Sequence, residues 1–397
     1  IFAAYSTVGK AREWDRPGIA VKIDLKSAFD VLLHSAVLEF LRPAAERSPN
    51  EVKLLVEMLR GGRQVMTFQG VQWHEDMLRG VPQGGSISAS LFARLVDSVC
   101  HSLQETWDRK GIPAVLSPDA VRQYLLAFAD DLLLWAPGWR QLEVMLLDLA
   151  AAFERCGLHI NRDKLRAIAT PALAQPGDVR ECAGFRIPVV EQMDYLGVPL
   201  CWGNNNELLV DSLLRRAWQQ FFTYRRVLTC RRTPPAKRMH LFNTLVTSAW
   251  AWAGGLVRPT AKIVRSFEVA WLSMLVSIVG FPRDADLHWI LDLQARRRAA
   301  RQLAEHFGLD SWSKIVLARS FTWLGHLARQ RPLRDRPAAV ALQDRGMDWW
   351  RSVQVGGRSV IPHPQRGSWP SMDRDLTEFF EALDEDGSWR ERAQERA

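Results

Sequence analysis

The sequence predicts an α+β fold, in which an antiparallel sheet carries helices on one face and a largely helical region follows. Two observations lead to this prediction. In the first half, short apolar runs alternate with stretches whose apolar residues have helical spacing. After Trp202 the chain changes to amphipathic segments, which indicate helices near 207–229, 236–252, 261–280 and 287–308.

Each element of the first half has its own signal. The run IAVKIDLKS at 19–27 predicts a strand, and YLLAFADDLLLWA at 124–136 predicts a hairpin that Pro137-Gly138 closes. Apolar spacing over 140–156, with Gly157 after it, predicts a helix and its end. The other expected elements, in order, are a helix from Phe29 to Leu41, a helix at 51–60, a hairpin at 63–78, a turn at Pro82 to Gly85, a helix from Ser88 to about Trp107, a strand near Leu165–Ala169 and a loop or boundary at 171–190.

Composition gives weaker information about partners. The formal net charge is +8, and most basic residues are Arg, which suits either a polyanionic partner or an ordinary basic protein. We expect most of the 17 Trp residues to fill the core. The five Cys residues lack zinc-site spacing and are expected as free thiols. No signal peptide is evident, and the stretch from Leu241 to Val257 is short for a membrane span, so we expect an intracellular protein of the nucleus or cytoplasm.

Three carboxylates stand inside or beside apolar strands. Asp24 is flanked by Ile23 and Leu25, and Asp130 and Asp131 lie at the tip of the second predicted hairpin. Burying an isolated carboxylate is costly, and two adjacent acids repel each other unless a cation lies between them. Such oxygen ligands suit Mg²⁺. Taken alone, however, the Asp pair is better explained as a solvated turn.

Five motifs in family order resemble those of reverse transcriptases of the non-LTR (LINE-type) retrotransposons. VKIDLKSAFD (21–30) resembles motif A, GVPQGGSISASLF (80–92) motif B, AFADD (127–131) motif C, GLHINRDK (157–164) motif D and YLGVPL (195–200) motif E. FTWLGHLAR at 321–329 resembles the W-x-G-H-x-x-R segment that follows the thumb in many non-LTR elements. The resemblance implies an RNA-directed DNA polymerase with the right-hand fold of palm, fingers and helical thumb.

The resemblance also implies roles for single residues. Asp24 and Asp130 match the aspartates that hold the catalytic metals. Asp131 matches the second acid of motif C, a catalytic residue and metal ligand that is less tightly tied to the metal, and the carbonyl of Leu25 is expected beside the second metal. Two Mg²⁺ ions are implied, with Mn²⁺ as an alternative. Phe29 matches an aromatic steric gate that excludes a ribose 2′-OH and so favours dNTPs, although it also suits the core end of its helix.

Other matches concern the substrates. Gln83 and Gly84 match the P-Q-G core of motif B, where the backbone approaches nucleotide and template, although P-Q-G-G-S departs from the P-Q-G-x-P of many relatives. Lys164 occupies the motif D lysine position, from which a cation meets the triphosphate and protonates pyrophosphate; a solvated turn lysine is the alternative. The segment that matches the primer grip is Tyr195, Leu196 and Gly197.

The same resemblance divides the chain and names its partners. We expect a palm with truncated fingers at 1–200, a helical thumb at 201–280, and a basic, Trp-rich helical region with a weakly ordered tail at 281–397. The implied partners are an RNA template, a DNA primer and dNTPs, with the duplex held through its phosphates by Arg-rich helices and no membrane involved. Few residues precede Asp24, so we expect weaker activity from this chain alone than from a whole element.

Alternatives remain open from sequence. A catalytically impaired or domesticated remnant would bind nucleic acid without incorporating nucleotides. A group II intron maturase-like polymerase shares the motifs, but the short gap between motifs A and B and the W-L-G-H stretch favour the retrotransposon type. An RNA-templated RNA polymerase is disfavoured because Phe29 should exclude ribonucleotides.

Overall fold

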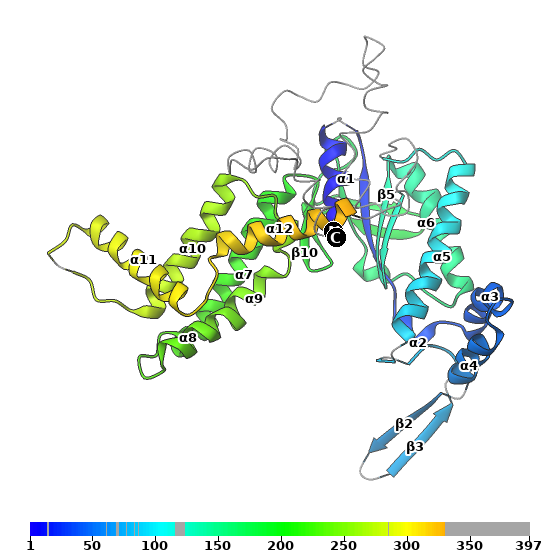
Figure 1. Cartoon of the computed structure of the whole chain (residues 1–397). Helices are drawn as coiled ribbons and strands as arrows, with labels where there is room; N and C mark the ends of the chain where they lie inside the picture. Colours follow the sequence, from blue (N-terminus) through cyan, green and yellow to red (C-terminus); the bar gives the residue numbers. More distant parts are fainter. Residues whose placement is uncertain are drawn as a thin grey trace. The chain divides into compact units, whose positions relative to one another are not determined.

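The computed structural model describes residues 1–13, 16–60, 62–68, 71–76, 78–82, 84–85, 87–115, 124–284 and 286–329 (Figure 1). The chain forms two compact units, which we describe separately. One unit is Asp15–Leu196, and the other combines Ile1–Trp14 with Gly197–Ala397.

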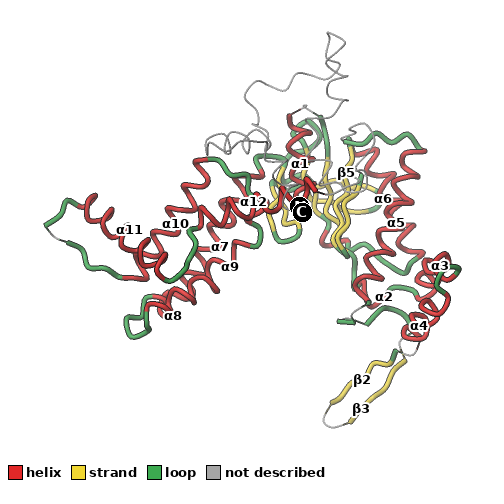
Figure 2. The backbone as a smooth tube through the Cα atoms, viewed as in Figure 1, coloured by secondary structure: helices red, strands yellow, loops and turns green. Residues whose placement is uncertain are grey.

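A four-stranded antiparallel sheet lies at the centre of the unit Asp15–Leu196 (Figure 2). Its strand order is β4-β5-β1-β6. The strands are β1 (Ile19–Asp24), β4 (Leu125–Phe128), β5 (Asp131–Ala136) and β6 (Arg166–Ala169). Strand β1 is an inner strand, and its apolar side chains are fully buried, which explains its nearly continuous apolar sequence.

Two long helices pack against this sheet. Helices α5 (Ser88–Arg109) and α6 (Trp139–Arg155) contact each other, and they contact β4 and β5 respectively, so they cover one face. Their apolar stripes share one core with β1 and β5. The expected α+β class is therefore confirmed, and the helix expected at 140–156 ends as predicted, with Gly157 at φ +77° after the last turn.

The helix expected from Phe29 to Leu41 is wrong as a single element. The structure has two helices here, α2 (Ala28–Val31) and α3 (His34–Ala45), with extended backbone at Leu32 and Leu33 between them. Tertiary hydrogen bonds replace the helical ones at this break. The carbonyl of Leu32 accepts from the Gly80 N–H at 2.7 Å, and the Leu33 N–H donates to Cys156 at 2.9 Å.

The segment 171–190 is also not only a loop. It contains a hairpin of β7 (Val179–Cys182) and β8 (Phe185–Pro188). The turn residues Ala183 and Gly184 both have positive φ, the backbone that two-residue hairpin turns require. The remaining elements of this unit are α4 (Pro49–Arg60), the predicted hairpin of β2 (Arg63–Phe68) and β3 (Val71–Asp76), the 3₁₀ turn η1 (Arg162–Lys164) and β9 (Gln192–Tyr195).

The other unit is mainly helical. Its elements are α1 (Phe2–Glu13), β10 (Val198–Cys201), α7 (Asn205–Leu228), α8 (Pro235–Leu241), the π-helix η2 (Phe242–Thr247), α9 (Ser248–Ala251), η3 (Gly254–Leu256), α10 (Ala261–Val279), α11 (Trp289–His306) and α12 (Trp312–Arg329). Helix α10 contacts both α11 and α12, so helices on both sides of the boundary expected at 280 share one core. The tail predicted from about residue 330 lies outside the described residues.

Large aromatic side chains fill the core of this helical unit. Trp250, Trp271 and Trp312 are buried, whereas Trp252 and Trp289 are exposed, so the core expected for most Trp residues takes only part of those in this unit. The Trp312 ring stacks on Phe242, and its Nε1 donates to the Thr247 hydroxyl at 2.9 Å. Of the helices described, none is both long and apolar enough to cross a lipid bilayer.

Candidate metal and nucleotide site

The strand register brings two of the predicted acids together. Asp24 is the last residue of β1, Asp131 is the first residue of β5, and the two are directly opposite in the antiparallel ladder. Residues paired in this way have their side chains on the same face of the sheet. Asp130 lies in the turn immediately before β5, after Ala129 with its φ of 52°. The three aspartate residues therefore lie at one end of the sheet.

Each of the two opposed carboxylates has an ammonium partner. The Lys164 Nζ lies 3.0 Å from Asp24 Oδ2, and the Lys22 Nζ lies 3.3 Å from Asp131 Oδ1. Like charges directly opposite each other destabilise a strand pair, and these two cations offset that repulsion. Among the described residues, Asp130 has no ion-pair partner. It is the acid whose charge is least compensated.

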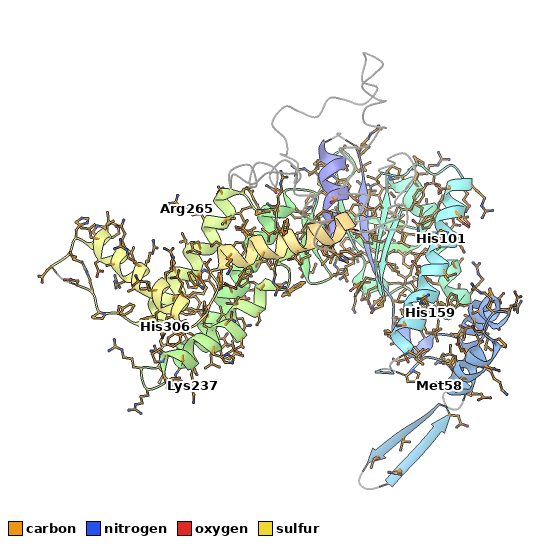
Figure 3. The ribbon with its side chains drawn as sticks, viewed as in Figure 1. Met58, His101, His159, Lys237, Arg265 and His306 are labelled. Carbon is orange, nitrogen blue, oxygen red and sulfur yellow. The ribbon has the colours of Figure 1, made fainter. Side chains whose placement is uncertain are left out.

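Motif D is held against the end of β1 by backbone hydrogen bonds. The Asn161 N–H donates to the Asp24 carbonyl at 2.8 Å, and the Lys26 N–H donates to the His159 carbonyl at 2.8 Å (Figure 3 labels His159). These bonds fix the start of η1, from which Lys164 reaches Asp24.

Asn161 is a site residue that the motif comparison missed. Its Nδ2 donates to Asp24 Oδ2 at 3.4 Å, while its Oδ1 accepts from the Asp163 N–H at 3.2 Å and so caps η1. The available signal was its residue type, because Asn is a preferred N-cap residue directly before a helical turn.

The predicted steric gate is part of a small aromatic contact. The Phe29 ring is half-buried and lies against the Phe92 ring of α5, with ring centroids 4.6 Å apart. The Phe29 carbonyl accepts from the Val81 N–H at 2.7 Å, which fixes the start of motif B beside α2. The ring therefore has a core contact, as the alternative interpretation expects, and the geometry leaves its role as a gate a prediction.

Motif B continues into more open backbone. Gly84 is exposed, with a φ of +82°, and a Cβ added there would meet no atom within 4 Å. Such a backbone leaves room for a ligand to approach closely. Gln83 lies outside the described residues.

The three predicted primer-grip residues fall on either side of the division between the two units. Tyr195 ends β9 and is 2 % exposed, and burial, followed by the charge of Asp131, raises its pKa. The phenol is therefore neutral at ordinary pH. Leu196 and Gly197 follow with φ of 50° and 77°, which defines a tight turn.

The oxygen atoms at this end of the sheet suit a divalent cation. The carboxylates of Asp24 and Asp130, with the carbonyl of Leu25 next to Asp24, are hard ligands of the kind that Mg²⁺ prefers. Within the described ranges, no group of three or more His, Cys, Asp or Glu side chains is placed to hold a metal ion alone. A bound ion would therefore take further oxygens from water or phosphate, as Mg²⁺ commonly does.

Comparisons with known proteins bear on the family of the chain. Residues 6–200 match the family model described as reverse transcriptase (RNA-dependent DNA polymerase). The chain is 27% identical over 166 residues to the Pol polyprotein of a type-1 R2 retrotransposable element from Popillia japonica. This match covers 42% of this chain and 23% of the relative. It is 25% identical over 356 residues to the Pol polyprotein of the type-2 element R2DM from Drosophila melanogaster. This match covers 80% of this chain and 31% of the relative. The chain thus spans at most 31% of the length of these relatives.

Solved telomerase structures are more distant. The structure of apo telomerase from Candida tropicalis matches with a TM-score of 0.39 and 12% identity, over 85% of this chain and 55% of that one. Telomerase from Candida albicans with a fragment of telomeric RNA matches with a TM-score of 0.38 and 13% identity, over 82% of this chain and 52% of that one. Likeness at this level carries no argument about function.

Proposed function

The chain belongs, through residues 6–200, to the reverse transcriptases of non-LTR retrotransposons, and from this premise we propose that it is an RNA-directed DNA polymerase. Such an enzyme adds dNMP to a primer 3′-OH as an RNA template directs. The observation that carries the proposal is the strand register that sets Asp24 opposite Asp131, with Asp130 in the preceding turn.

The three acids and Lys164 have different roles in the proposed reaction. Asp24 and Asp130 would hold the metal, with the Leu25 carbonyl as a further oxygen ligand, and Asp131 is the third acid of the site. Two Mg²⁺ ions are expected, with Mn²⁺ as an alternative, and when bound they stabilise the attacking and leaving oxygens of the displacement. Lys164 has a side chain that is 63% exposed, so it is free to turn from Asp24 to a triphosphate and protonate the leaving pyrophosphate.

The remaining residues bind and select the substrates. Phe29 excludes the ribose 2′-OH, and Gln83 and Gly84 bring the motif B backbone to the nucleotide. The turn that follows β9 positions the primer end through Tyr195, Leu196 and Gly197.

The two units take different parts in this function. We assign the unit Asp15–Leu196 to the palm and the helices after Gly197 to the thumb, whose arginines hold the duplex through its phosphates. The partners are an RNA template, a DNA primer and dNTPs, and the place of action is intracellular, in the nucleus or cytoplasm.

A primer-extension assay on poly(rA)/oligo(dT) with Mg²⁺ tests the proposal. Wild-type protein should incorporate dTMP, a chelator should stop incorporation, and Asp130→Asn should lower kcat by about 10²–10³-fold because it removes a preorganised electrostatic contact. Asp310→Asn is the matched control, because Asp310 is exposed and its ion pair among the described residues is with Lys314, four positions along the chain.

The assay distinguishes a polymerase from a protein that only binds nucleic acid. Incorporation that Asp310→Asn keeps and Asp130→Asn loses supports the enzyme. Wild-type protein that binds the primer–template without incorporating nucleotides would show a remnant that binds nucleic acid only.

A further inference from the structure

We infer that Lys22 is a positioning residue, which fixes Asp131 beside the metal ligands and ties it to β9, and that Asp131 serves this ion pair rather than a metal ion. The inference deepens the proposed function and rests on it. It assigns a role to a lysine that the motif comparison leaves without one.

The position of Lys22 follows from strand geometry. Lys22 precedes Asp24 by two residues on β1, and alternation along a strand sets both side chains on the same face. Its Nζ lies 3.3 Å from Asp131 Oδ1 and also donates to the Asp194 carbonyl at 2.9 Å. One ammonium group thus joins β1, the first residue of β5, and β9.

The neighbouring cation does not compete for this role. Arg166 on β6 is the register partner of Lys22, so the two positive side chains lie at the same level of the sheet. The Arg166 guanidinium donates instead to the backbone carbonyls of Asp163 and Leu165, at 2.8 and 2.6 Å. Asp131 is therefore left to Lys22.

The Lys22–Asp131 ion pair is half-buried. The Lys22 and Asp131 side chains are only 23% and 29% exposed, so solvent ions screen their interaction less than that of an exposed pair. The charge of Asp131 also reaches the buried Tyr195 hydroxyl, whose pKa it raises after the larger effect of burial. Without Lys22, a carboxylate charge would face a neutral phenol and the opposed Asp24.

The contacts of the three acids separate their roles. Lys164 holds Asp24 through a single contact from an exposed side chain, beside the long 3.4 Å bond from Asn161 Nδ2, and a metal ion can replace this lysine. Lys22 holds Asp131 while also bound to β9, so moving it away would break the link to the proposed primer-grip turn. A metal ion therefore finds Asp24 and Asp130 available, whereas Asp131 stays with Lys22.

The test uses the full chain in the primer-extension assay, with kcat, the KM for primer–template and the half-saturating Mg²⁺ concentration measured for each variant. Lys22→Met should raise that KM and lower kcat/KM by about 10–100-fold. The reason is that loss of the lysine contacts displaces the primer end by up to about an ångström. Lys22→Arg should restore most of the loss. Asp131→Asn should match Lys22→Met, and the double variant should lose no more than either single one.

The Mg²⁺ requirement decides between the two roles of Asp131. We expect Asp24→Asn to raise the half-saturating Mg²⁺ concentration, and Asp131→Asn and Lys22→Met to leave it unchanged. A raised requirement in Asp131→Asn alone, or additive losses in the double variant, would overturn the inference. Lys53→Met, at an exposed lysine of α4 that contacts Glu57 at 3.9 Å, is the matched control and should behave as wild type.

The failure of the proposed function is distinguishable from the failure of this inference. If wild-type protein does not extend the primer, the polymerase proposal fails. The ion pair is then tested by urea unfolding of the wild type, Lys22→Met, Asp131→Asn and the double variant. Coupling between Lys22→Met and Asp131→Asn in that double-mutant cycle supports the ion pair, and independent effects overturn it. Should Lys22→Met not fold, Lys22→Gln takes its place in both measurements.

Discussion

The acids near the end of β1 differ in how far neighbouring lysines compensate their charges. Asp24 and Asp131 are each neutralised by a lysine, and within the described residues Asp130 is not. A cation is therefore attracted most strongly near Asp130, because no lysine among the described residues already neutralises that carboxylate. Phe29 is a second case, since its ring packs against Phe92 and is also the steric gate that we propose.

The two roles of Phe29 can be separated by substitution. Phe29→Val should raise rNTP incorporation relative to dNTP by about 10–100-fold, because a smaller side chain no longer opposes the 2′-OH. It should also lower the free energy of unfolding by about 1–3 kcal/mol through lost packing against Phe92. Single-nucleotide incorporation and urea unfolding measure the two effects.

Phe29→Tyr is the control, because it keeps the ring and should keep the discrimination. A destabilised Phe29→Val protein that gains no rNTP incorporation would leave Phe29 as a core residue only.

At the scale of elements, the decisive feature is how motif B is attached to motif A. The Gly80 N–H donates to the Leu32 carbonyl at 2.7 Å, and the Val81 N–H donates to the Phe29 carbonyl at 2.7 Å. This close approach needs glycine, since Gly80 has a φ of +84° and a Cβ there would lie 2.7 Å from the Asp30 carbonyl oxygen. The same bonds break the expected long helix into α2 and α3, so the loop and the helix break are one feature.

Gly80→Ala tests this attachment. The added methyl group would collide with backbone atoms that cannot move aside, so we expect a loss of roughly 2–4 kcal/mol in the free energy of unfolding. Gly111→Ala is the matched control, because Gly111 also has a positive φ but open space around the added Cβ; it should cost about 1 kcal/mol. Equal losses in the two variants, measured by urea unfolding, would show that backbone strain alone matters.

At the scale of the whole molecule, charge is the property that bears on partners. The chain carries a net charge of +8, and exposed basic side chains occur at the end of α7, in the segment leading into α8 and within α8. They are Arg225, Arg226, Arg231, Arg232 and Lys237, the last of which is labelled in Figure 3. A surface of this kind attracts phosphate groups of any sequence.

The salt dependence of binding checks this reading. Raising the salt from about 50 to 200 mM should weaken primer–template binding by roughly two orders of magnitude, because counterions released from the phosphates drive association. Replacing Arg225 and Arg226 by Gln should flatten the slope of log K against log salt without changing the preference between sequences. Fluorescence anisotropy measures both, and an unchanged slope would remove these arginines from the interface.

Pattern alone predicted the elements that have strong periodicity. The central strand, the acidic hairpin and the amphipathic helices after Trp202 lie close to where their apolar spacing predicts them. Helix α1 was not predicted, because its buried face is built partly from Ala3, Ala4 and Ala11, which give little contrast between faces. The hairpin at 179–188 was missed because its strands are short and its turn is Ala-Gly rather than a stronger turn pair.

The sequence by itself determined the acids, the motif order and the family, since these depend on residue type and spacing along the chain. The tertiary structure decided which groups meet: that Asp24 lies opposite Asp131, that the Lys22 ammonium contacts both the Asp131 carboxylate and the Asp194 carbonyl, and that Asn161 caps the turn beside Asp24. The physical reason is that strand register and long-range hydrogen bonds are set by packing between distant segments, which local sequence pattern does not encode.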